Sequence, residues 1–156
     1  MASKKYAILT DIHGNLEALK TSLSIISQQS NVEKIIFLGD YFSLGPAPVE
    51  VFNILSDMSP ETVFIRGNHE RYLLEKIWDN KNPKIEGMKS NDPVLNGIVD
   101  HQKWVYEQIG TNLLDFIEQR TKISYNEIIG SNYLEFSHAW FKRDEKVPSV
   151  DEASEL

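Results

Sequence analysis

The sequence predicts an α/β fold made of repeated strand–helix units. Three short, continuous apolar runs support this prediction: residues 6–9, 35–38 and 63–65. Such runs are typical of strands that are buried on both faces of a parallel sheet. Polar residues follow each run, and Asp11, Asp40 and Asn68 are separated by 29 and 28 positions. Each interval can hold one strand, one loop and one helix, so we expect a βαβαβα arrangement with right-handed crossovers.

Three helices are expected between and after these strands. Their apolar residues recur at helical spacing: Leu16, Leu19, Leu23 and Ile26; Val49, Phe52, Leu55 and Met58; Leu73, Leu74 and Ile77. Asn15 stands where an N-cap residue would begin the first helix. Three unrelated amphipathic segments are the alternative, but their regular alternation with the apolar runs favours strand–helix units.

The second half of the chain carries weaker patterns. In order, we expect a loop, two helices and a hairpin: residues 80–97, 98–108, 112–119, and 123–125 with 133–136. Gly110 separates the two helices, and Gly130 lies in the hairpin turn. The last residues are charged and nearly devoid of core side chains, which is typical of a frayed tail. The length therefore predicts one domain, residues 1–141, followed by a charged tail, residues 142–156.

Composition limits the classes of function. Hydrophobic residues make up 41% of the 156 residues and the formal net charge is −7. An acidic chain repels the phosphate backbone, which makes nucleic acid an unfavourable partner, although bound cations could reverse the local charge for a small phosphate ester. The chain has no cysteine, which excludes disulfides, thiolate zinc sites and thiol catalysis. No apolar run suits a membrane span or signal-peptide core, so we expect a soluble, cytoplasmic protein with no membrane partner.

Polar side chains of metal-ligand type follow each of the three predicted strands. Asp11 and His13 follow the first strand, Asp40 follows the second, and Asn68 and His69 follow the third. Ligands of open α/β sheets bind beyond the carboxyl ends of the strands. We therefore expect these five side chains to lie close together.

The chain has four histidines, and three of them follow predicted strands. His138 is the third, closely following residues 134–136, whereas His101 lies in a helical stretch and is interpreted as an ordinary surface residue. A single loop histidine is usually structural, but the set with Asp11 and Asp40 favours a metal site. Carboxylate, imidazole and amide donors without sulfur suit Mn²⁺, Fe²⁺, Ni²⁺ or Zn²⁺. A carboxylate such as Asp40 can bridge two cations of a phosphoryl-transfer site.

The motifs of other phosphate-binding and hydrolytic sites are absent from the sequence. It contains no Gly-x-Gly-x-x-Gly fingerprint, no P-loop and no Gly-x-Ser-x-Gly elbow. These absences speak against a nucleotide-binding α/β domain without metal, which is the weakest of the functions that we consider.

The motifs Asp-x-His, Gly-Asp and Gly-Asn-His-Glu resemble those of the calcineurin-like metallophosphoesterase superfamily. The runs at residues 11–19 and 39–46 resemble its small bacterial phosphodiesterase branch, and the likeness covers residues 5–140. The resemblance implies a sandwich of two mixed sheets flanked by helices. It also implies two divalent metal ions, with Mn²⁺ favoured, and hydrolysis of a phosphodiester or phosphomonoester by a metal-bound hydroxide.

The resemblance also implies a role for each matching residue. Asp11 and His13 would hold the first metal, and Asp40 would bridge both. Asn68 would hold the second metal, together with His138.

Two neighbouring residues would act in catalysis by the same resemblance. His69 would contact the phosphate and stabilise or protonate the leaving oxygen. Glu70 would orient His69.

One motif of the family is missing from the sequence. The family completes its site with Gly-His-x-His, but the 18 residues after His138 contain neither glycine nor histidine. We therefore expect an incomplete second sheet, a truncation relative to the family, and an oligomer or domain-swapped assembly that covers the exposed edge. The missing motif also favours an alternative function, a catalytically weak or inactive phosphoesterase-like binding protein.

Overall fold

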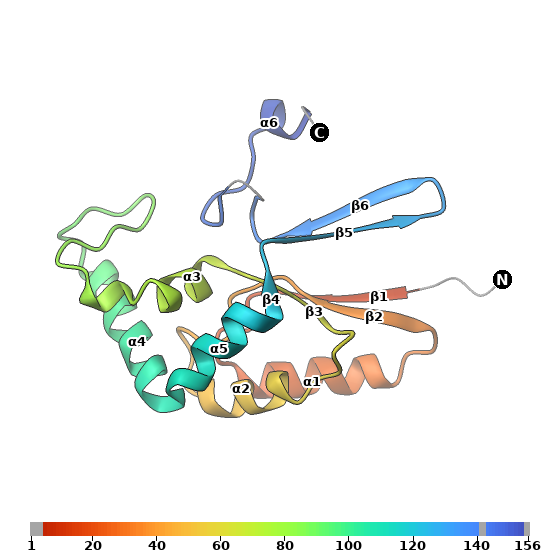
Figure 1. The fold of residues 1–156 in the computed structure, drawn as a ribbon, viewed down its shortest axis with the longest axis horizontal. Coiled ribbons are helices and arrows are strands. Elements are labelled where there is room, and N and C mark those ends of the chain that lie inside the picture. Colours follow the sequence, from red (N-terminus) through yellow and green to blue (C-terminus); the bar gives the residue numbers. More distant parts are fainter. Residues whose placement is uncertain (1–4, 141–142, 155–156) are drawn as a thin grey trace.

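A computed structural model describes residues 5–140 and 143–154 (Figure 1). Within these residues, a four-stranded parallel sheet has the order β1-β2-β3-β4, and an antiparallel hairpin pairs β5 with β6. The strands are β1 (Lys5–Leu9), β2 (Val32–Phe37), β3 (Val63–Ile65), β4 (Thr121–Lys122), β5 (Ser124–Ile129) and β6 (Asn132–Ser137). Residues 1–4, 141–142 and 155–156 lie outside the described residues, and the expected domain boundary falls among them.

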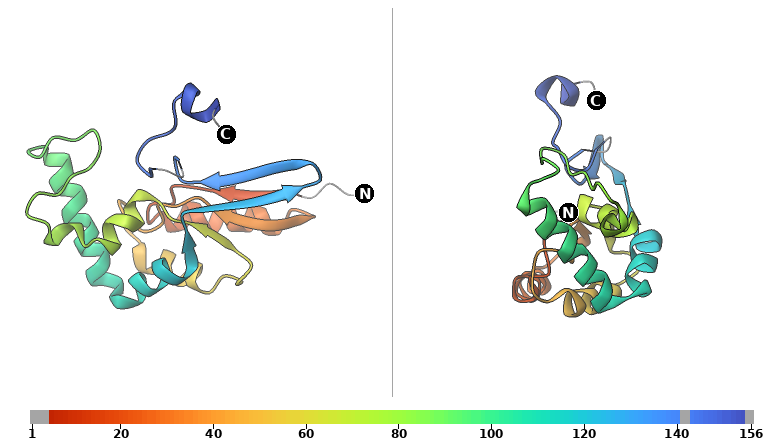
Figure 2. Two further views of the ribbon diagram at one scale, coloured as in Figure 1. Left: turned by 45° about the horizontal axis from the view of Figure 1, so that its top comes forward. Right: turned by 90° about the vertical axis from the view of Figure 1, so that its left-hand side faces the viewer.

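The helices cover one face of the parallel sheet and the carboxyl ends of its strands. They are α1 (Leu16–Ser27), α2 (Pro48–Ser56), α3 (Asn68–Leu74), α4 (Pro93–Ile109), α5 (Thr111–Arg120) and α6 (Val150–Ser154), with a 3₁₀ turn at Ile77–Asp79. Figures 1 and 2 show α1, α2 and α5 on one face of the sheet and the β5–β6 hairpin over the other. Both α3 and α4 lie beyond the carboxyl ends of the strands. None of the helices described is long and apolar enough to cross a lipid bilayer.

The predicted α/β class and the two sheets are confirmed, with one correction. Within the described residues neither sheet is mixed, because one is parallel throughout and the other is antiparallel. The sequence also does not predict β4. A strand of two residues is too short to show periodicity, and it forms because β3 offers a free edge, where the Arg66 amide donates to the Lys122 carbonyl (2.7 Å).

Helix boundaries follow capping residues more closely than apolar spacing. The Asn15 side chain accepts a hydrogen bond from the Ala18 amide (3.0 Å), which confirms the predicted start of α1. The predicted loop at residues 80–97 is wrong over its last five positions, because α4 begins at Pro93. Asp92 caps this helix by accepting from the Val94 amide (2.9 Å), and proline is well suited to a first helical position.

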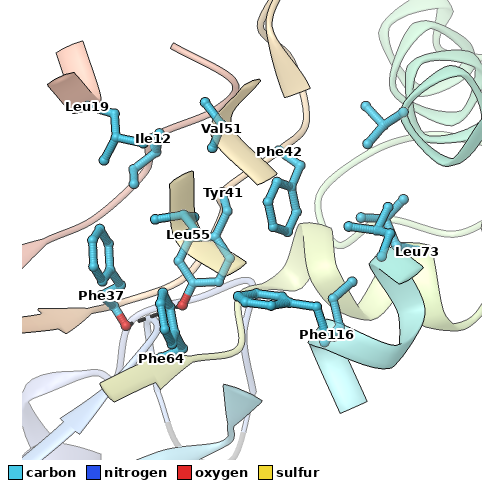
Figure 3. Packing of buried hydrophobic residues seen from close by; sticks show 13 residues of the cluster. Ile12, Leu19, Phe37, Tyr41, Phe42, Val51, Leu55, Phe64, Leu73 and Phe116 are labelled. Atoms are coloured by element: carbon cyan, nitrogen blue, oxygen red, sulfur yellow. Dashed lines mark hydrogen bonds between the residues drawn. The ribbon is translucent and has the colours of Figure 1, made fainter. Parts of the chain in front are cut away.

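The main core lies between the parallel sheet and its helices, and aromatic rings dominate it (Figure 3). The Phe64 ring stacks on Phe37 with 5.1 Å between centroids and meets Phe116 edge-on at 5.3 Å. Burying each such side chain contributes about 1.5–3 kcal/mol. The buried Tyr41 hydroxyl donates to the carbonyls of Phe37 (3.3 Å) and Ile65. This core therefore anchors the loop after β2 to the ends of β2 and β3.

The opposite face of the sheet is covered only in part. Ile36, Val63 and Ile65 are buried there beneath the hairpin residues Tyr125 and Phe136. Beyond them, however, none of the strands described pairs with the outer edge of β1, and a groove of about 420 Å³ lies between β1 and β6. Its lining is mostly apolar: Tyr6, Ile8, Ile129, Leu134, Glu135 and Phe136.

The segment after the hairpin packs against α3. Arg71 donates to Asp144 (Nε to Oδ2, 2.7 Å) and to Glu145 (Nη2 to Oε1, 2.5 Å), and Glu145 also accepts from the Tyr72 hydroxyl (2.5 Å). The expectation of a frayed tail is therefore wrong for Asp144 and Glu145. The charges that suggested a solvated tail instead pair with a cation on α3.

Candidate metal centre

The loops that follow β1 and β2 carry the candidate ligands in an unusual backbone conformation. Asp11, His13 and Asp40 have φ values of 53°, 47° and 59°, in the left-handed region that costs about 1–2 kcal/mol for an L-residue. Backbone hydrogen bonds between the two loops hold this conformation. The His13 amide donates to the Asp40 carbonyl (2.9 Å), and the Gly14 amide donates to the Tyr41 carbonyl (2.8 Å). Backbone strain of this kind clusters at functional sites.

Two glycines allow the strand ends to approach each other. A Cβ atom on Gly67 would lie 2.1 Å from Asp40 Oδ1, and one on Gly39 would lie 2.7 Å from the Gly67 backbone. The glycines of the Gly-Asp and Gly-Asn-His-Glu motifs are therefore required by space. They let the Asp40 carboxylate lie directly against the backbone that begins α3.

The structure brings together all five side chains that the resemblance names as metal ligands. His13 Nε2 lies 3.5 Å from Asp11 Oδ1 and 3.8 Å from Asp40 Oδ2. His138 Nε2 lies 3.5 Å from the same Asp40 oxygen and 3.0 Å from Asn68 Oδ1. Asp40 Oδ2 thus lies between two groups, Asp11 with His13 on one side and Asn68 with His138 on the other.

Backbone carbonyls set the orientation of the two outer histidines. His13 Nδ1 donates to the Ser43 carbonyl (3.1 Å), and His138 Nδ1 donates to the Leu38 carbonyl (2.6 Å). A carbonyl oxygen only accepts, so each Nδ1 carries a hydrogen, and a ring with no second proton presents an Nε2 lone pair. Metal-binding histidines are typically held by such a hydrogen bond from the other ring nitrogen.

These donors fit a divalent cation. Asn68 donates through Nδ2 to the Tyr72 hydroxyl (3.4 Å), so its Oδ1 faces His138 Nε2 at 3.0 Å, and the two atoms are both acceptors when the His138 hydrogen is on Nδ1 alone. The two carboxylates and the Nε2 of His13 also offer only lone pairs to the centre. Acceptors gathered in this way repel one another unless a cation lies among them, and oxygen with imidazole nitrogen suits first-row divalent metals.

Two buried carboxyl groups at the site, Asp40 and Glu70, have raised pKa values. Burial raises the pKa of Asp40 to about 6, with His138 acting in the opposite direction and Asp11 adding to the rise. Burial, and next the charge of Asp40, raises the pKa of Glu70 to about 7. A bound cation would favour the ionised form of Asp40 and so offset part of the desolvation cost.

The Glu70 carboxylate makes no hydrogen bond to the His69 ring within the described residues, so its implied role of orienting that ring stays a prediction. The carboxylate accepts hydrogen bonds from three backbone amides instead, those of Asp40 (2.8 Å), Tyr41 (2.8 Å) and Gly67 (3.0 Å). Glu70 is fully buried, and a carboxylate there satisfies several donors at once. This residue therefore joins the loop after β2 to the start of α3.

The buried His69 ring meets a residue that sequence reasoning did not identify. Gln102 Nε2 on α4 lies 2.6 Å from His69 Nδ1, and Gln102 Oε1 accepts from the Ser43 hydroxyl (2.9 Å). A usable signal was present, because Gln102 is a polar residue in the buried stripe of α4 that also holds Leu95 and Val105. Burial is also the main reason why the pKa of His69 falls to about 4.

His101 is not an ordinary surface residue, as its helical position suggested. Its Nδ1 accepts from the Leu44 amide (3.1 Å), and its half-buried ring meets Trp104 edge-on at 5.0 Å. Leu44 has a φ of 73°, so His101 supports a strained position of the loop after Asp40. Helix α4 therefore contributes to the site through two consecutive residues.

Sequence comparisons identify relatives of known family. The family model for calcineurin-like phosphoesterase matches residues 4–153. A symmetrical bis(5'-nucleosyl)-tetraphosphatase of Pseudomonas putida (strain GB-1) is 28% identical over 120 residues, which is 77% of this chain and 38% of that protein. An uncharacterized protein of Methanocaldococcus jannaschii is 31% identical over 106 residues, 59% of this chain and 42% of that protein. The chain thus spans less than half the length of these relatives.

Solved structures share the fold. A hypothetical protein from Pyrococcus horikoshii OT3 matches with a TM-score of 0.65 at 25% identity, covering 83% of this chain and 52% of that one. A metallophosphoesterase from Sphaerobacter thermophilus matches with a TM-score of 0.52 at 22% identity, covering 83% and 45%.

Proposed function

Because the chain belongs to the calcineurin-like phosphoesterase family, we propose that it hydrolyses phosphate esters with two divalent metal ions, of which Mn²⁺ is favoured. The single observation that best supports this proposal is the position of Asp40 Oδ2 between the Nε2 atoms of His13 and His138. One carboxylate oxygen that faces two imidazole lone pairs suits a bridge between two cations.

Each candidate ligand takes a role in this proposal. Asp11 and His13 would hold one cation, Asn68 and His138 the other, and Asp40 both. When bound, such cations neutralise phosphate oxygens and lower the pKa of a water.

His69 would act on the substrate rather than hold a cation. Its ring centroid lies 5.2 Å from that of His13, beside the candidate ligands. From there its Nε2 could donate a hydrogen bond to a phosphate oxygen or to the leaving oxygen, where charge develops during hydrolysis.

The substrate that we propose is a small phosphate ester. The curated relatives from Pseudomonas are named as symmetrical bis(5'-nucleosyl)-tetraphosphatases, so a dinucleoside tetraphosphate is the first compound to test. A chromogenic phosphodiester and the matching phosphomonoester, assayed beside it with added Mn²⁺, separate the three classes of substrate.

The decisive variant is Asp40→Asn. The amide removes one negative charge from the centre, so we expect loss of most Mn²⁺ binding and of most hydrolysis. His69→Ala is the matched variant, expected to bind Mn²⁺ as the parent does while turnover falls about 10²- to 10⁴-fold. Metal content and hydrolysis of the chromogenic diester are the two readouts. Full activity of Asp40→Asn would refute the mechanism, and metal binding without turnover in the parent would favour the binding-protein alternative.

We also propose that a second copy of the chain covers the groove between β1 and β6. Ile8 in this groove is 52% exposed and Leu134 is 36% exposed, and the outer edges of both strands have no partner strand within the described residues. Exposed apolar surface beside an open edge favours association. Light scattering should show a dimer that Leu134→Lys converts to a monomer, and a monomeric parent would contradict the proposal.

A further inference from the structure

The three histidines at the centre face two different kinds of partner. His13 and His138 each donate through Nδ1 to a backbone carbonyl, which leaves Nε2 as a lone pair. His69 has no such carbonyl partner among the described residues, and the amide of Gln102 lies against its Nδ1 instead. The partner of Nδ1 decides which ring nitrogen carries the hydrogen.

The structure places the two ends of the Gln102 amide against different partners. Its NH₂ nitrogen lies 2.6 Å from His69 Nδ1, and its Oε1 accepts from the Ser43 hydroxyl (2.9 Å). An amide nitrogen only donates, so Nδ1 is the acceptor and the neutral His69 ring carries its hydrogen on Nε2. His69 is therefore the opposite tautomer to His13 and His138.

Ser43 connects these assignments. Its carbonyl accepts from His13 Nδ1 (3.1 Å), while its hydroxyl donates to Gln102. Ser43 and Gln102 are both fully buried, where an unsatisfied polar group costs about 1–3 kcal/mol, so these side chains need each other as hydrogen-bond partners. One residue of the loop after β2 thus helps to set two histidines in opposite states.

We propose that Gln102 is a positioning residue that keeps His69 in its Nε2–H tautomer and so makes it a hydrogen-bond donor at the centre rather than a metal ligand. Distance alone does not exclude His69 as a ligand, because nitrogen or oxygen atoms of His13, Asp40 and His69 lie within 4.8 Å of one another. With a hydrogen on Nε2, the ring has no lone pair for a cation on that side. The catalytic consequence rests on the proposed function, whereas the tautomer does not.

Nitrogen NMR of the ring tests the tautomer directly. Long-range ¹H–¹⁵N correlation spectra of the metal-free, histidine-labelled protein at neutral pH distinguish Nδ1–H, Nε2–H and doubly protonated rings. We expect Nε2–H for His69 and Nδ1–H for His13, with the His69 signals identified by their loss in His69→Ala. An Nδ1–H or doubly protonated His69 ring overturns the proposal.

Substitutions of Gln102 test its part in this state. In Gln102→Glu, the carboxylate only accepts, so the His69 hydrogen should move to Nδ1 or the ring should become doubly protonated. Gln108→Leu is the matched control, because Gln108 is an exposed glutamine on the same helix, and it should leave the spectrum unchanged. An unchanged His69 spectrum in Gln102→Glu would refute the role of Gln102.

Kinetics then connect the tautomer to the reaction. Gln102→Leu should lower kcat about 10- to 100-fold with little change in KM or Mn²⁺ content. The loss should be larger for an alkyl ester than for a p-nitrophenyl ester, because the alkoxide leaving group needs a hydrogen-bond donor more. An equal loss for both esters would indicate a merely structural role and would overturn the inference. No hydrolysis by the parent chain would instead count against the proposed function and leave the tautomer result intact.

Discussion

At the scale of single residues, the two carboxylate oxygens of Asp40 have different partners. Oδ1 accepts from the His69 amide (3.1 Å), while Oδ2 faces the Nε2 atoms of His13 and His138. Glu70 in turn holds the Asp40 amide. The side chain that we propose as the bridge is thus oriented by the start of α3, and not by its own loop alone.

Gly67→Ala should displace Asp40 and weaken metal binding. The new Cβ would lie 2.1 Å from Asp40 Oδ1, closer than atoms can approach, so the carboxylate or the start of α3 must move. We expect a stability loss of about 1–3 kcal/mol and much weaker Mn²⁺ binding, measured by urea unfolding and by titration calorimetry.

Gly97→Ala is the control for this change. Gly97 lies in α4, and a Cβ there meets no atom within 4 Å, so alanine should stabilise the helix by about 0.5–1 kcal/mol and leave Mn²⁺ binding unchanged. Normal Mn²⁺ affinity in Gly67→Ala would show that Asp40 is not needed where the structure places it.

At the scale of elements, helices α3 and α4 lie beyond the carboxyl ends of the strands, and the segment at residues 143–145 packs against α3. The first turn of α3 carries Asn68 and His69, and α4 adds Gln102 behind the His69 ring. Arg71, one turn further along α3, holds the segment at residues 143–145. Helix α4 and the segment at residues 143–145, which are far apart in the sequence, therefore both contact the short helix α3.

Arg71→Ala should release this segment without unfolding the sheet. The side chain makes hydrogen bonds to both Asp144 and Glu145, and bonds between charged groups contribute about 1.5–3 kcal/mol each when partly buried. We expect faster amide exchange in residues 143–152 and unchanged exchange in β1 to β3. Lys103→Ala removes an exposed pair with Glu107 (3.8 Å) and should change neither. Equal exchange in Arg71→Ala and the parent would mean that the ion pairs do not hold the segment.

At the scale of the whole molecule, the buried carboxylates make stability depend on pH. The pKa values of Asp40 (about 6) and Glu70 (about 7) lie above the ordinary values of 3.8 and 4.5. At a pH between the ordinary value and the raised value, each carboxyl group is therefore protonated in the folded state and ionised in the unfolded state. The free energy of unfolding therefore falls as pH rises through this window.

His69 acts in the opposite direction, because its lowered pKa (about 4) makes stability rise with pH up to its ordinary value of 6.5. The two carboxylates outweigh this one histidine, so the metal-free protein should show a net loss of stability of about 1–3 kcal/mol between pH 4 and pH 7. Urea unfolding in a chelating buffer measures this trend across the range. Added Mn²⁺ should reverse it at the upper end, because a cation favours the ionised carboxylates. A rise in metal-free stability over the same window would contradict the raised pKa values.

Local patterns were sufficient for most of the fold. Continuous apolar runs, the Asn15 cap and the Gly130 turn depend on neighbours in sequence, and α1, the parallel sheet and the hairpin follow them. The strand β4 and the segment at residues 143–145 were missed, because each is held by a distant partner. The start of α4 was missed although its capping signal, Asp92 before Pro93, was present.

The sequence by itself determined that the side chains after β1, β2 and β3 gather at the site, whereas His138 on the separate hairpin and Gln102 on α4 are brought there by the tertiary structure. Parallel strands end at one edge, so residues that follow β1, β2 and β3 must meet there wherever the helices pack. Only the tertiary structure decided what surrounds each of them: that Glu70 accepts from backbone amides, and that Gln102 rather than Glu70 contacts His69. The direction and partner of a buried polar side chain depend on which donors and acceptors lie within about 3 Å of it, and residues far apart in the sequence supply those groups.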